Sequence, residues 1–167
     1  MSKNDTYFVL HFLNGAPQSG DVPKPDNPDD LHVTFLAHIS APDRFSGEIM
    51  LAFYDAADAA NVFTLTPNGY EKFGKYGQHK VITLADDDGK AKDLHNDLLE
   101  RVMKIRGTDL IQPNYAGEFY SPHITVLDDN HELTLGAGIP ISSLTLVRHI
   151  GGLNGEIEVL ASVSLSA

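Results

Sequence analysis

Short runs of apolar and β-branched residues, separated by turn-forming residues, recur along most of the 167-residue chain and predict a protein rich in β-strands. The first run, Thr6 to Leu13, is rich in β-branched and aromatic residues and predicts a buried strand. Further strands are predicted at 31–36, 62–66, 80–84, 122–127, 141–150 and 156–164. The last two are joined by Gly151-Gly152-Leu153-Asn154-Gly155, which predicts a hairpin. No helix follows these glycines, so they do not form a dinucleotide-binding loop.

Two segments have the apolar spacing of helices. Residues 43–61 are rich in alanine, although Gly47 leaves a strand at 49–54 as an alternative. Residues 90–106 carry one apolar stripe, formed by Leu94, Leu98, Val102 and Ile105. Asp86-Asp87-Asp88 precedes this stripe and predicts a helix N-terminus. We favour capping over a metal site there, because no other carboxylates cluster nearby in the sequence.

The remaining segments contain helix- and strand-breaking residues. Residues 14–30 are rich in Pro, Gly and Asp and predict a long surface loop, either a tolerated excursion or a lid beside His32. Pro67-Asn68-Gly69 predicts a turn.

One pattern occurs twice. Leu31-His32-Val33-Thr34-Phe35-Leu36 is repeated as Pro122-His123-Ile124-Thr125-Val126-Leu127, 91 positions later (123 minus 32). Successive side chains of a strand point to opposite faces, so each His and Thr share one face while the apolar residues share the other. Each copy therefore predicts a strand with an apolar face for a core and a polar face for a cleft.

Composition narrows the class of protein. Twelve Lys and Arg against 23 Asp and Glu give a formal net charge of -11, which disfavours a long nucleic-acid duplex as partner and leaves a nucleotide or an RNA end. The absence of cysteine excludes disulfides and thiolate chemistry. No apolar run is long enough for a membrane span, and residues 1–5 do not resemble a secretory signal, so we expect a cytoplasmic protein without a membrane partner. The length suits one domain, while the oligomeric state stays open.

The repeated pattern predicts acid–base chemistry. Histidine, with an unperturbed pKa of about 6.5, exchanges a proton near neutrality, so two of them facing one cleft can serve as base and acid on opposite sides of a phosphorus. Thr34 and Thr125 would donate hydrogen bonds to the non-bridging oxygens. This scheme needs no metal or other cofactor, and no zinc-type spacing of histidines occurs. The other histidines lack the repeated context and are interpreted as structural or solvated: His11, His38, His79, His95, His131 and His149.

With His32-Val33-Thr34, Tyr120-Ser121-Pro122-His123-Ile124-Thr125-Val126 and the intervening helix, the chain resembles the 2H phosphoesterases, also described as 2′-5′ RNA ligase-like or cyclic phosphodiesterases. The resemblance implies an α+β fold over residues 1–167, with two pseudo-symmetric lobes. Each lobe would have an antiparallel sheet and outer helices, with the active-site cleft between them. It also implies hydrolysis of 2′,3′-cyclic or 2′-5′-linked phosphodiesters at nucleotide or RNA ends. Two alternatives remain, namely 2′-5′ RNA ligation and a non-catalytic nucleotide-binding module.

Several positions qualify the resemblance. Many RNA-processing members have an arginine where this chain has Asp128, and a carboxylate facing the cleft would oppose phosphate binding. Tyr115 and Tyr120 are candidates for stacking on a base, whereas Phe119 is interpreted as interface packing. Arg148 is interpreted as a solvated residue, with a phosphate contact as the alternative.

Overall fold

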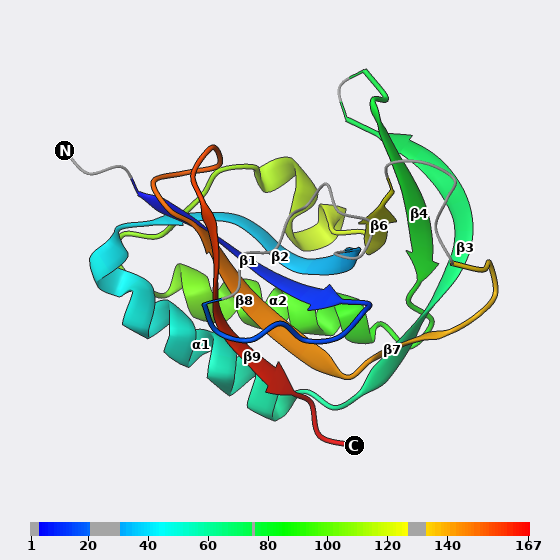
Figure 1. Ribbon diagram of the computed structural model, residues 1–167, viewed down its shortest axis with the longest axis horizontal. Coiled ribbons are helices and arrows are strands. Elements are labelled where there is room, and N and C mark those ends of the chain that lie inside the picture. Colours follow the sequence, from blue (N-terminus) through cyan, green and yellow to red (C-terminus); the bar gives the residue numbers. More distant parts are fainter. Residues whose placement is uncertain (1–3, 21–30, 75, 127–132) are drawn as a thin grey trace.

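The two His-x-Thr strands belong to different antiparallel sheets. The computed structural model describes residues 4–20, 31–74, 76–126 and 133–167 (Figure 1). The five-stranded sheet has the order β5-β2-β1-β8-β9, and the four-stranded sheet has the order β6-β4-β3-β7. The strands are β1 (Asp5–Phe12), β2 (His32–Ala41), β3 (Phe63–Phe73), β4 (His79–Ala85), β5 (Asp109–Leu110), β6 (His123–Thr125), β7 (Ile139–Ile141), β8 (Ser143–His149) and β9 (Ile157–Ser164).

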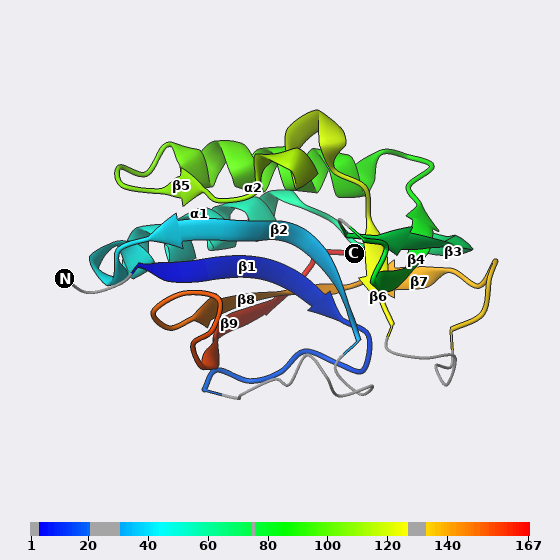
Figure 2. The same cartoon turned by 90° about the horizontal axis from the view of Figure 1, so that it is seen from above.

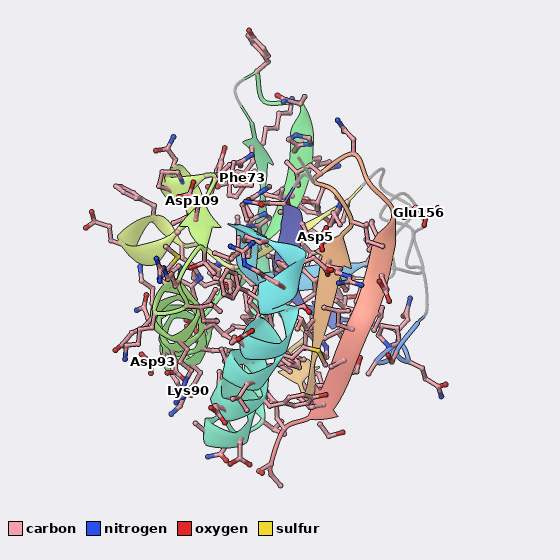
Figure 3. The ribbon with its side chains drawn as sticks, turned by 90° about the vertical axis from the view of Figure 1, so that its left-hand side faces the viewer. Asp5, Phe73, Lys90, Asp93, Asp109 and Glu156 are labelled. Atoms are coloured by element: carbon pink, nitrogen blue, oxygen red, sulfur yellow. The ribbon has the colours of Figure 1, made fainter. Side chains whose placement is uncertain are left out.

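Two helices, α1 (Ser46–Ala59) and α2 (Lys90–Met103), lie side by side over one face of the five-stranded sheet (Figure 2). Helix α2 contacts β2, and α1 contacts β8 and β9. Lys90 and Asp93 point away from the sheets on the outer side of α2 (Figure 3). Both predicted helices are confirmed, and the alternative of a strand at 49–54 is wrong.

Asp86 caps α2. Its two carboxylate oxygens accept hydrogen bonds from the backbone N–H groups of Ala91 and Lys92, both at 3.0 Å. These groups belong to the first turn of the helix and have no partner within it. Capping, which the sequence favours for the Asp86-Asp87-Asp88 run, is therefore confirmed for Asp86.

Both motif strands have the predicted alternation of a buried apolar face and a polar face. Val33 and Phe35 of β2 are fully buried, as is Ile124 of β6, and Val126 is nearly so. All four belong to one apolar cluster that also contains buried side chains of both helices and both sheets. The predicted α+β fold with two lobes is confirmed, and the two lobes share one core.

Two predicted elements are wrong in detail. Pro67-Asn68-Gly69 does not end a strand but lies within β3, where a bulge shifts the register against β4 between Pro67 and Gly69. The bulge accommodates the missing N–H of the proline, so the strand continues to Phe73. The run 141–150 is two strands, since β7 pairs with β3 while β8 pairs with β1 and β9. The predicted β8–β9 hairpin is confirmed.

Part of the predicted loop at 14–30 lies alongside β9 and is hydrogen-bonded to it. The N–H of Gly20 donates to the carbonyl of Val159 at 3.0 Å, and the Ser162 hydroxyl donates to the carbonyl of Pro17. The remainder of that loop, residues 21–30, and Asp128 lie outside the described residues. In the described part of the chain, no helix is long and apolar enough to cross a membrane.

Candidate active site

The four motif side chains border one cleft. His32 and Thr34 come from β2, and His123 and Thr125 come from β6, a strand that β2 contacts. The cleft has a volume of about 880 Å³. The structure therefore brings together the pairs that the repeat predicts, although they lie 91 positions apart.

The His123 ring is held in one orientation. Its Nδ1–H donates to the carbonyl of Ser121 at 2.9 Å, so Nε2 is the acceptor of the neutral imidazole. The ring of Phe73, at the end of β3 (Figure 3), meets it edge to face at 4.7 Å. Burial lowers the pKa of His123 below its usual 6.5, against the opposing effect of the Ser121 bond. His123 is therefore neutral at pH 7 and able to take up a proton.

The first motif lies at the start of β2. His32 pairs with Phe12 of β1, and the two rings lie 5.6 Å apart. Thr34, two residues on, is half-buried, and its carbonyl accepts a hydrogen bond from the Tyr120 hydroxyl at 2.9 Å. That bond ties the first motif directly to the segment that precedes the second.

A further contact between the motifs comes from His95 and Tyr120, which we call the imidazole clamp. The Nδ1–H of His95 donates to the carbonyl of Phe35 at 2.7 Å, and its Nε2 accepts from the N–H of Gly117 at 2.8 Å. The ring lies parallel to that of Tyr120, with 4.2 Å between centroids. Burial lowers the pKa of His95 and raises that of Tyr120, so both keep the protonation states that these bonds need.

The cleft is suited to an anion despite the acidity of the chain. Among its described lining residues there is no Asp, Glu or Arg, and Lys72 is the one permanent cation. Six of the eight histidines border it: His32, His38, His79, His95, His123 and His149. Neutral imidazoles supply hydrogen bonds without repelling phosphate, and protonated ones attract it.

The interpretation of the other histidines as structural or solvated fits three of them. His11 and His95 are buried and bonded to backbone groups, and His79 is exposed. His38 and His149 line the cleft beside the motifs, as do His79 and His95, and His131 lies outside the described residues. For His95 and His149, the sequence contains a sign that the side chain is not simply solvated. His95 precedes Leu98 by three positions and so flanks the apolar helical stripe, and His149 shares a strand face with Val147.

The aromatic candidates lie at the cleft. Tyr115 is 51% exposed and Phe119 is 63% exposed, so the interpretation of Phe119 as interface packing is wrong. Tyr120 uses one ring face against His95. Stacking of Tyr115 or Tyr120 on a base stays a prediction.

Arg148 does not line the cleft. Its guanidinium forms ion pairs with Asp43 and Glu158, each at 2.9 Å, and with Asp5 at 3.7 Å. Both the phosphate contact and the solvated position are therefore wrong for this residue. Within the described ranges, no three His, Asp or Glu side chains are grouped so that they could hold a metal ion.

No protein-family model and no curated protein matches the sequence. Several solved structures are similar in fold. E. coli LigT complexed with 3′-AMP has a TM-score of 0.62 at 16% identity, covering 98% of this chain and 99% of LigT. TT0787 of Thermus thermophilus has a TM-score of 0.65 at 19% identity, covering 96% and 97%. A phosphoesterase has a TM-score of 0.62 at 17% identity, covering 98% and 99%. The resemblance that the two motifs indicate is thus confirmed for the fold: over nearly its whole length, this chain has the fold of E. coli LigT.

Proposed function

We propose that this protein is a metal-independent phosphodiesterase that hydrolyses a 2′,3′-cyclic phosphate or a 2′-5′-linked nucleotide or RNA end. The observation that carries the proposal is the convergence of both His-x-Thr motifs on one cleft whose described lining has no carboxylate. The similar fold of LigT, which was crystallised with the nucleotide 3′-AMP, supports a nucleotide as ligand.

In the proposed reaction, one neutral imidazole removes a proton from water as the water oxygen attacks the phosphorus. The other imidazole, protonated, donates its proton to the ribose oxygen as the P–O bond to that oxygen breaks. The lowered pKa of His123 favours this residue as the base and leaves His32 as the acid. The hydroxyls of Thr34 and Thr125 donate to the non-bridging oxygens, where negative charge increases in the transition state.

Substitution of each motif histidine tests the proposal. His32→Ala and His123→Ala should each lower kcat for a nucleoside 2′,3′-cyclic phosphate by about 10²–10⁴-fold. His79→Ala is the matched control, because His79 is an exposed cleft histidine outside the motifs, and it should lose less than tenfold. Unchanged turnover in both motif variants, with melting temperatures near that of the wild type, would contradict the mechanism.

The same assay separates the alternatives. Thermal stabilisation by cyclic and 2′-5′-linked nucleotides, without turnover of any of them, would indicate a non-catalytic binding module. Joining of RNA ends by the wild-type protein would indicate 2′-5′ ligation.

A further inference from the structure

Three aromatic rings outside the motifs form a second cluster in the cleft. We call Phe8, His38 and His149 the ring cluster. The Phe8 centroid lies 5.1 Å from that of His38 and 4.9 Å from that of His149. The three residues come from β1, β2 and β8, and all three line the same cleft as the motifs.

The backbone of β2 is distorted to place His38 there. Leu36 pairs with Val9 and Ile39 with Tyr7, so two residues of β2, Ala37 and His38, oppose Phe8 alone. His38 has φ +58°, and among the described non-glycine residues it is the one with a positive φ. Its Nδ1 is buried without a hydrogen-bond partner in the described structure. Unfavourable backbone and unsatisfied polar atoms of this kind concentrate at binding sites.

The ring cluster is neutral. Burial lowers the pKa of both His38 and His149, and the proximity of His149 lowers that of His38 further. The Nδ1–H of His149 donates to the carbonyl of Leu153 at 3.3 Å, which leaves its Nε2 as an acceptor. The neighbouring cleft residues Leu10, Val147 and Ile157 are apolar. These surroundings suit an uncharged planar group with polar edges better than a second phosphate.

The ring cluster lies within reach of a nucleoside held by the motifs. Thr34 pairs with Leu10, and Phe8 is two residues farther along β1. At the rise of a strand, that separation is about 7 Å. Ribose and base extend over a comparable distance from a phosphate bound at the motifs.

We propose that the ring cluster binds the nucleobase of the nucleotide whose phosphate lies between the two His-x-Thr motifs. The base stacks on the rings, and its polar edge bonds to the imidazoles. This inference rests on the proposed function and identifies the substrate as a nucleotide rather than a phosphodiester without a base.

His38→Gly tests this inference, because glycine adopts a positive φ without strain and the fold should be retained. The variant is compared with the wild type on adenosine 2′,3′-cyclic phosphate and on methyl ribofuranoside 2,3-cyclic phosphate, which lacks a base. We expect KM to rise about tenfold or more for the adenosine substrate and to change little for the base-free one. His79→Gly, the control, should not discriminate between the two substrates.

Two outcomes would overturn the inference: an unchanged KM for the adenosine substrate, or an equal rise for both substrates. Failure of the wild type to hydrolyse either substrate contradicts the proposed function instead. In that case, calorimetric binding of adenosine alone still tests the ring cluster. Weaker binding by His38→Gly would support it, and equal binding would refute it.

Discussion

The hydrogen bonds of the imidazole clamp should contribute measurably to the free energy of unfolding. His95→Phe keeps a ring beside Tyr120 but removes the bonds to the Phe35 carbonyl and the Gly117 N–H. His95 is only 2% exposed and Phe35 is fully buried, so water cannot replace the bond to the Phe35 carbonyl, whereas Gly117 is half-buried. A buried polar group left unsatisfied costs about 1–3 kcal/mol, so loss of the Phe35 bond should lower the free energy of unfolding by that amount. For a domain of this size, the melting temperature should fall by roughly 2–12 °C.

The same substitution should change the pH dependence of stability. The pKa of His95 in the folded protein is below its unfolded value of about 6.5. Between these two values the unfolded chain binds more protons, so the free energy of unfolding decreases as the pH falls below about 6.5. One histidine contributes a slope of about 1.4 kcal/mol per pH unit in this window. His95→Phe should remove that contribution and leave a flatter profile.

Urea unfolding of the wild type and His95→Phe at several pH values between 5 and 8 measures both effects. His79→Phe provides the control, since His79 is exposed and its replacement should change stability by less than about 0.5 kcal/mol. If His95→Phe were as stable as this control at pH 7, or kept the wild-type slope below pH 6.5, the clamp would not be the contact that we describe.

Three further predictions concern single side chains. Thr125→Val should lower kcat for a cyclic phosphate by roughly 10-fold or more, because a hydroxyl donor to the transition state is lost. Thr64→Val, at an exposed position of β3, should leave kcat unchanged. A rise in KM for Thr125→Val with no change in kcat would contradict this role of Thr125. Arg148→Gln should destabilise the fold by about 1–3 kcal/mol in urea unfolding, because buried Asp5 loses its cation, and it should leave KM unchanged. Asp86→Ala should cost about 0.5–2 kcal/mol by the same measurement, while Asp88→Ala, with an exposed side chain, should cost less.

The motif strands could be predicted from the sequence because apolar and polar residues alternate in them, and the apolar residues are the ones that the fold buries. Val33 and Phe35 must be buried together, and this requirement alone turns His32 and Thr34 to the opposite face. The second copy obeys the same rule. The helices were predictable for a similar reason, since each has one apolar face along its length.

Features that depend on pairing with distant strands were not predictable from local pattern. The run 141–150 is rich in apolar residues on both sides of Ser142, and nothing in the local pattern marks Ser142 as the point where the chain leaves one sheet for the other. The position of His38 depends on a bulge against β1, which alternation along β2 does not reveal. Capping by Asp86 rather than by its neighbours likewise depends on the turn that Gly89 forms before α2.

The interleaving of early and late strands has a consequence for synthesis of the chain. β1 ends at Phe12, but β8, its partner on one side, begins only at Ser143, 131 residues later (143 minus 12). At ordinary rates of translation that interval is roughly 7–26 s. During this time one edge of an apolar strand has no native partner, which favours association with other chains or with chaperones. A polypeptide truncated before Ser143 would therefore be prone to aggregate, although it contains both motifs.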